Sequence, residues 1–176
     1  MKHYFRLSDA QWRSVVGHLL PSDSLLESAA FLFARASCTD ASRTLTVVDI
    51  ALAQPQDFAH QYEDYLELTD TARVRLQKAA TKLEASIIEV HSHPTQSVAA
   101  FSLADLFGFK ESVPQMRWRL HDRPYGAIVM APTSFDALVW WDTTGPAMVD
   151  AVHLGESLLT PTGRTREVDD GWRRAL

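Results

Sequence analysis

Two histidines separated by a single residue, His91 and His93, are the side chains of this sequence best suited to chemistry. The apolar run 86–90 before them predicts a β-strand, and side chains two apart on a strand leave the same face. Both imidazoles would then point the same way, as two ligands of one metal ion must. Asp105, which follows after a loop, could supply a third ligand. Three protein ligands and one open position are typical of a catalytic zinc site rather than a structural one.

A second acid, Glu89, stands two residues before His91 and would share its strand face. Three consecutive positions on one face of a strand spread over roughly 13 Å, at about 3.3 Å per residue, which is too far for one ion. The sequence therefore favours Asp105 as the third ligand. It leaves Glu89 as a group that either supports a ligand or lies on the surface.

Ser102 and Asp105 also have a purely structural explanation. Ser-x-x-Asp is close to a capping box, in which the serine caps a helix and the acid three residues on reaches back to the chain. Such a cap would explain both residues without a metal. The two explanations are compatible for Ser102, because a capping serine can still present its hydroxyl to a site.

Composition limits the kind of protein that could carry such a site. The 176 residues, 46% hydrophobic and 22% charged, are enough for one domain with a core. A net charge of -5 argues against nucleic acid or an anionic membrane as the main partner. With one cysteine, Cys38, a transition metal must be held by histidines and carboxylates. We find neither an apolar signal segment nor an apolar run long enough for a membrane span, and we expect a cytoplasmic protein.

The elements that would position these residues alternate between the helical and the strand period. Helical spacing predicts helices over 9–20 and 71–84, two turns from 102, and a fourth helix over 147–158. Strand patterns are found at 3–7, 26–37, 44–53, 60–68, 86–91, 116–121, 125–131 and 135–141. Residues 160–170 are polar and are expected to form a loose tail. This order predicts a mixed α/β domain with a curved central sheet flanked by helices.

The motif around the histidines resembles that of the JAB/JAMM (MPN-domain) metalloproteases. That family has a glutamate far upstream, then His-Ser/Thr-His-Pro, a loop and Ser-x-x-Asp. Here Glu27 precedes an apolar run, His-Ser-His-Pro occupies 91–94 and Ser-Leu-Ala-Asp occupies 102–105. The resemblance covers about residues 3–145 and includes the order of helices and strands. It implies an MPN/JAB domain over residues 1–158, followed by a C-terminal tail at 159–176.

One feature departs from the family pattern. Eleven residues lie between His93 and Asp105, where ten are common in the family. A surface loop absorbs one extra residue easily, so the departure bears on the geometry of the loop rather than on the set of ligands.

The resemblance implies a zinc hydrolase. His91, His93 and Asp105 would ligate Zn²⁺, with water in the fourth position. Glu27 would act as general base toward that water and then as acid toward the leaving amine, while Ser102 would help to hold the oxyanion. Zinc lowers the pKa of a bound water toward about 7, which agrees with hydrolysis at neutral pH.

The pattern also makes a demand on the fold. Glu27 lies about sixty residues before the histidines, so nothing local brings them together. The site can form only if the strand at 26–37 lies beside the strand at 86–91. Adjacency of these two strands is therefore a central structural prediction.

Members of the family cleave peptide or isopeptide bonds after the C-terminal tail of ubiquitin or a ubiquitin-like protein. The short single-domain form resembles bacterial members whose operons also encode E1-like and E2-like enzymes and a ubiquitin-like protein, some of them anti-phage. The resemblance therefore implies precursor processing or deubiquitinase-like deconjugation, with the substrate tail bound as an extended strand. Two alternatives stay open: a non-catalytic MPN scaffold, and a metal amidohydrolase in sulfur-carrier or cofactor metabolism.

Overall fold

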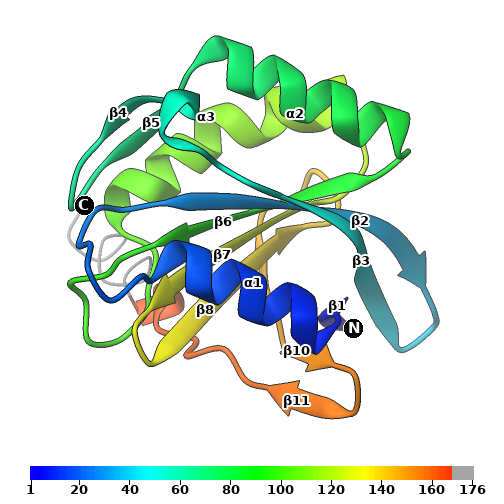
Figure 1. The fold of residues 1–176 in the computed structure, drawn as a ribbon. Coiled ribbons are helices and arrows are strands. Elements are labelled where there is room, and N and C mark those ends of the chain that lie inside the picture. Colours follow the sequence, from blue (N-terminus) through cyan, green and yellow to red (C-terminus); the bar gives the residue numbers. More distant parts are fainter. Residues whose placement is uncertain (168–176) are drawn as a thin grey trace, which may run out of the picture.

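A curved sheet of nine strands forms the middle of the computed structural model, which describes residues 1–167 (Figure 1). Its strands are β1 (Lys2–Leu7), β2 (Ala29–Cys38), β3 (Ser42–Leu52), β6 (Ser86–Ser92), β7 (Tyr125–Ala131), β8 (Ser134–Trp140), β9 (Ala147–Met148), β10 (Ala151–Leu154) and β11 (Ser157–Leu159). Across the sheet they lie in the order β11-β10-β1-β3-β2-β6-β7-β8-β9. The pairs β1–β3, β1–β10 and β6–β7 are parallel and the others antiparallel, so the sheet is mixed.

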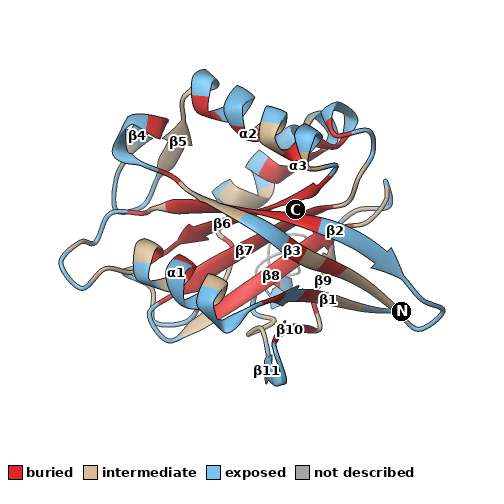
Figure 2. Cartoon of the chain, turned by 45° about the vertical axis from the view of Figure 1, so that its right-hand side comes forward, coloured by how far each residue is buried: buried red, intermediate tan, exposed pale blue. Residues whose placement is uncertain are grey.

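Helices cover both faces of this sheet (Figure 1). α1 (Asp9–Leu19) packs on one face, and α2 (Asp70–Lys82) and α3 (Leu103–Arg119) lie on the other. Successive strand residues alternate between the two cores: Leu32 and Ile88 pack with α1, whereas Phe31 and Ile87 pack beneath α2 and α3. Figure 2 shows the buried residues concentrated on the central strands. The mixed α/β architecture with a curved sheet between helices is confirmed.

Local signals predict most of the first half of the chain correctly. Ser8 caps α1 and Thr69 caps α2, each by accepting a backbone N–H with its side-chain oxygen. β2 and β3 correspond to the strand patterns at 26–37 and 44–53, and they pair as an antiparallel hairpin. The one strand expected over 60–68 is instead a small hairpin of β4 (Phe58–Gln61) and β5 (Leu66–Leu68), because a polar bend interrupts the pattern.

α3 departs most from the sequence prediction. We expected two helical turns from 102 and a strand over 116–121, but one helix runs from Leu103 to Arg119. Pro114 lies inside it, although proline lacks the N–H that a helix interior uses and disfavours the helical conformation of the residue before it. Burial at every fourth position from 109 to 117 outweighs that local signal.

The C-terminal part also differs from expectation. The helix expected over 147–158 is wrong, since this segment forms β9, β10 and β11. β10 pairs in parallel with β1, at the other end of the chain, and no local sequence pattern predicts this pairing. Residues 160–167, which the sequence assigns to a loose tail, pack against β8, while 168–176 lie outside the described residues. Within residues 1–167, we find no helix long and apolar enough to cross a membrane.

Candidate metal centre

The ends of β2 and β6 bring distant candidate residues together. The strands pair antiparallel, with His91 opposite the first residue of β2. The pairing continues beyond β2: the N–H of Ser28 donates to Oγ of Ser92 at 3.0 Å, and the N–H of Ser92 donates to O of Ser28 at 3.1 Å. One step further along this register, Glu27 stands beside His93. The predicted adjacency of these two strands is confirmed.

His91, His93 and Asp105 form a tight cluster whose ligand atoms all lie within 4.8 Å of one another. The two Nε2 atoms are 3.2 Å apart. Oδ1 of Asp105 lies 3.5 Å from Nε2 of His91, and its Oδ2 lies 3.4 Å from Nε2 of His93. Ligands about 2.0–2.1 Å from a tetrahedral zinc ion are separated by roughly 3.3 Å. The three side chains therefore have the spacing and the donor types that one such ion requires.

The first turn of α3 fixes Asp105 in this cluster. Oγ of Ser102 accepts from the N–H of Asp105 at 3.1 Å, and Oδ2 of Asp105 accepts from the N–H of Ser102 at 2.7 Å. The Ser102 hydroxyl also donates to Oδ2 at 2.8 Å. The capping box is therefore present, and it holds the carboxylate with its oxygens toward the histidines. A role of Ser102 toward an oxyanion stays a prediction.

Burial and charge set the protonation of the cluster. His91 and His93 are 7% and 5% exposed. Burial disfavours the Asp105 anion, but hydrogen bonds from both imidazoles outweigh it and hold the pKa of Asp105 well below its usual range. Burial likewise opposes the charged form of His91, yet the neighbouring carboxylate raises the pKa of His91. Asp105 is thus ionised, as a carboxylate ligand must be.

Glu27 lies at one side of the three-residue cluster. Its side chain is buried, with Oε1 3.4 Å from Nε2 of His93. Burial raises the pKa of Glu27 to about 7, and the attraction of the two histidines opposes that rise. A carboxyl group with a pKa near neutrality can both accept and release a proton at neutral pH, which is what general acid–base catalysis needs.

The β4–β5 hairpin fixes the backbone of Glu27, a support that sequence reasoning missed. The N–H of Glu27 donates to O of Tyr62 at 2.8 Å, and Nε2 of Gln61 donates to O of Glu27 at 2.9 Å. These partners lie 34 and 35 residues further along the chain, so no local pattern could reveal them. The small hairpin is therefore part of the site.

A buried carboxylate, Asp136, ties residues 160–167, here named the C-terminal strap, to β8. Asp136 is fully buried. Its Oδ1 accepts from the N–H of Gly163 at 3.1 Å, and its Oδ2 accepts from the N–H and the hydroxyl of Thr165 at 2.9 and 2.6 Å. An acid inside an apolar strand carries no local signal of this role, because its partners lie 27 and 29 residues downstream.

The C-terminal strap in turn holds the loop that leads into α3. Oγ1 of Thr165 accepts from the N–H of Phe101 at 3.1 Å, and the hydroxyl of Thr162 donates to O of Ala99 at 2.7 Å. Phe101 is fully buried, with its ring centroid 5.7 Å from that of His91. The loop is therefore anchored directly before the capping box.

Glu89 lies outside the metal cluster, as its spacing on the strand predicts. It is not a surface group either, because its carboxylate accepts a hydrogen bond from the Tyr125 hydroxyl. Burial raises the pKa of both Glu89 and Tyr125, so the tyrosine keeps the proton with which it bonds the carboxylate.

Nδ1 of His93, the ring nitrogen that faces away from the ligand cluster, lacks the hydrogen bond that metal-bound histidines commonly make. Such a histidine usually donates its second ring N–H to a neighbouring acceptor. Nδ1 of His93 is buried and has no hydrogen-bond partner within residues 1–167. The orientation of this ring therefore depends on packing and on the acids beside its Nε2, Glu27 and Asp105.

No protein-family model matches this chain, and no curated protein sequence matches it significantly. What the described residues provide is a cluster of two imidazoles and a carboxylate that is compatible with a metal ion, with a buried glutamate beside it.

Proposed function

We propose that this protein is a zinc-dependent peptidase or isopeptidase that cleaves after the C-terminal tail of a ubiquitin-like protein. The observation that carries the proposal is the position of Glu27, which comes from a distant segment and lies 3.4 Å from His93 beside the ligand cluster. This is the arrangement that the JAMM motif requires, and it supports an MPN/JAB assignment of the fold. Two imidazoles and one carboxylate form a donor set that suits Zn²⁺.

In the proposed mechanism, His91, His93 and Asp105 would hold a zinc ion. Such an ion would polarise the scissile carbonyl and make water a better nucleophile at neutral pH. Glu27 takes a proton from that water and returns it to the leaving amine, a transfer suited to a carboxyl group with a pKa of about 7. The Ser102 hydroxyl keeps Asp105 in place, and the JAMM motif assigns it the further role of stabilising the oxyanion.

The proposal places the protein in the cytoplasm, in a bacterial ubiquitin-like system of the kind that includes anti-phage defence. E1-like and E2-like proteins of the same operon would be its functional partners. Its reaction would be the processing of the ubiquitin-like precursor, the deconjugation of modified proteins, or both. The substrate tail would bind as an extended strand.

A metal assay and a cleavage assay test the proposal together. The chain is purified without chelators, its zinc is measured by mass spectrometry, and a ubiquitin-like protein from the same operon, fused to a C-terminal reporter, is offered as substrate. His93→Ala should lose both zinc and cleavage. Glu27→Gln should keep zinc and lose about 100- to 10,000-fold in turnover, whereas the exposed control Glu111→Gln should change neither.

The outcomes separate the alternatives. Protein that binds the ubiquitin-like partner but contains no zinc would identify a non-catalytic scaffold. Full turnover in Glu27→Gln would overturn the assigned mechanism. Zinc without cleavage of any ubiquitin-like fusion would favour an amidohydrolase that acts on another substrate.

A further inference from the structure

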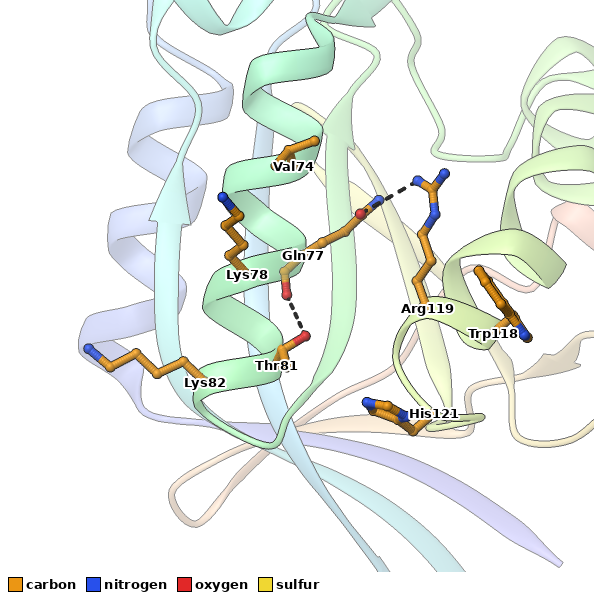
Figure 3. Close-up of a pocket in the computed structure, with 8 residues that line it drawn as sticks. All are labelled: Val74, Gln77, Lys78, Thr81, Lys82, Trp118, Arg119 and His121. Carbon is orange, nitrogen blue, oxygen red and sulfur yellow. Dashed lines mark hydrogen bonds between the residues drawn. The ribbon is translucent and has the colours of Figure 1, made fainter.

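A groove of about 710 Å³ lies between α2 and the C-terminal end of α3 (Figure 3). α2 lines it with Val74, Gln77, Lys78, Thr81 and Lys82, and the end of α3 with its following turn adds Trp118, Arg119 and His121. In Figure 3, Gln77 points toward Arg119, whereas the ends of the two lysine side chains extend to the side of α2 away from α3. Asp105 stands at the opposite end of α3, thirteen residues before Trp118. At 1.5 Å per residue, that separation is about 20 Å. The groove is therefore distinct from the candidate metal centre.

This groove is cationic on a protein whose net charge is -5. Lys78, Lys82 and Arg119 are its permanent cations, and no acidic side chain lines it. Neither lysine forms a salt bridge within residues 1–167, and Arg119 reaches the neutral Oε1 of Gln77 at 3.5 Å. Cations near a helix C-terminus favour the helix dipole, which accounts for Lys82 and Arg119 but not for Lys78, a turn earlier.

The groove also exposes large apolar side chains. Trp118 is 73% exposed and Val74 is 46% exposed. On the same turn of α3 the charged Arg117 is buried, so the usual inside–outside preference is reversed at these two neighbours. An exposed indole with a cationic rim is the composition of a surface that binds a partner.

A strained turn places His121 at the mouth of the groove. His121 and Asp122 both adopt the left-handed conformation, with φ of 57° and 58°, which non-glycine residues take up at a cost. Arg117 stabilises the turn by donating to O of Asp122 at 3.1 Å and to O of Arg123 at 3.2 Å. The buried arginine thus has a structural role that the exposed tryptophan beside it lacks.

We propose that this groove docks an acidic protein segment that carries one aromatic or large aliphatic side chain. The acids would pair with Lys78, Lys82 and Arg119, and the apolar side chain would cover Trp118 and Val74. From Val74 to Lys82 the groove follows α2 for about 12 Å, which fits roughly four extended residues or two helical turns. A polyanion such as nucleic acid fits less well, because the protein as a whole repels it.

Docking here would leave the metal centre accessible, so the inference goes beyond the proposed hydrolase activity and does not depend on it. A segment held at one end of α3 would bring a partner to the enzyme while a substrate tail occupies the other end. Affinity from such a second contact adds to that of the tail without changing the chemistry.

Selection of short random peptides displayed on phage against the full chain tests the proposal. The selected peptides should be rich in Asp and Glu around one aromatic or large aliphatic residue. Lys78→Glu/Lys82→Glu should weaken their binding at least about tenfold, because two attractions become repulsions. Arg13→Glu/Lys110→Glu makes the same change in net charge at exposed positions outside the groove, and should leave binding unchanged.

Several results would overturn the proposal. Peptides without acidic enrichment, or peptides that bind both double variants equally, would exclude an acidic segment at this groove. Tighter binding of a single-stranded DNA probe that is lost in Lys78→Glu/Lys82→Glu would make it a nucleic-acid surface, and self-association lost in the same variant would make it a contact between copies. Cleavage by the metal centre should be equal in all these variants, so failure here leaves the hydrolase proposal untouched.

Discussion

The two ends of α3 carry opposite kinds of surface. At the N-terminal end, Ser102 and Asp105 are hydrogen-bonded to each other, and the carboxylate is oriented toward two buried imidazoles. At the C-terminal end, Trp118 and Arg119 point outward, and the cations of the groove lack acidic partners among the described residues. The helix dipole favours acids at the first end and bases at the second, but it explains neither the histidines nor the tryptophan. One end is organised before any ligand arrives, whereas the other presents cations without acidic partners and an exposed indole.

Asp105→Asn should disrupt the ligand cluster at the N-terminal end of α3 more than any other single substitution discussed below. Asparagine keeps the shape of the side chain and can still accept from the N–H of Ser102, but it removes the anionic ligand. We expect loss of zinc and a fall in cleavage of about 1,000-fold or more, because metal ions contribute several kcal/mol to transition-state stabilisation. Zinc content and turnover are the measurements.

Ser102→Ala is the matched control for this prediction. It removes the helix cap, at a cost of about 1 kcal/mol of folding free energy, and leaves all three ligands in the chain. It should still bind zinc, with an affinity about tenfold lower because the hydroxyl no longer orients Asp105. If Asp105→Asn kept zinc as well, Asp105 would be a capping residue alone.

Thr165→Val tests whether the C-terminal strap helps to hold the metal-ligand cluster at the N-terminal end of α3. The substitution leaves the Phe101 N–H without its acceptor and Asp136 with one donor fewer, both in a buried setting. We expect a loss of about 1–3 kcal/mol in the free energy of unfolding. Zinc affinity, measured against a competing chelator, should fall about tenfold, the effect typical of residues that support metal ligands.

Two further threonine variants complete this test. Thr165→Ser restores the hydroxyl and should recover both stability and zinc affinity. Thr81→Val removes a hydroxyl at the groove, where it bonds O of Gln77 at an exposed position, and should change neither quantity. Equal zinc affinity in Thr165→Val and the wild type would mean that the strap stabilises the fold without positioning the ligands.

The parts of the site that could be predicted from the sequence are those whose residues lie close together in the chain. His91 and His93 two apart, and Ser102 and Asp105 three apart, are local patterns, and the structure places them as those patterns require. Position in a family motif, rather than any local signal, singled out Glu27.

Apart from the β2–β6 pairing that the family motif required, contacts between distant segments escaped prediction. The strap depends on Asp136 and on partners nearly thirty residues later, and β10 pairs with β1 from the other end of the chain. The prediction of only two turns for α3 was wrong, because buried side chains on either side of Pro114 outweigh the one hydrogen bond that the proline removes. The groove needed three-dimensional information as well, since its residues come from two helices.

Asp57 joins α2 to the segment that leads into the β4–β5 hairpin, and the ionisation of its carboxyl group predicts that the stability of the fold depends on pH. Its carboxylate accepts two hydrogen bonds at 2.9 Å from Arg75 of α2, and it lies just before the hairpin that holds Glu27. Hydrogen bonding from Arg75 lowers the pKa of Asp57 below its ordinary value. The folded state therefore binds this proton less readily than the unfolded state, so the stabilisation is present above about pH 4 and is lost as the pH falls through the lower, folded value.

Asp57→Asn should therefore cost about 1.5–3 kcal/mol in unfolding free energy near neutral pH, the range for hydrogen bonds to charged groups. The difference from the wild type should shrink steadily below about pH 4. Urea denaturation over a pH series measures it. A difference that did not depend on pH would mean that the two side chains interact through packing rather than through charge.

Of these variants, Trp118→Ala should change the stability of the fold least. It tests directly whether the C-terminal end of α3 serves binding rather than packing. Phe109, on the same helix, is buried between Phe101 and Trp140, and its truncation should cost about 3–5 kcal/mol. Trp118 is largely exposed, so its truncation should change the unfolding free energy by less than about 0.5 kcal/mol while weakening the selected acidic peptides severalfold. A loss of stability comparable to that of Phe109→Ala would instead make Trp118 a packing residue. A change confined to peptide binding would mean that this end of α3 presents its apolar surface to a partner rather than to the core.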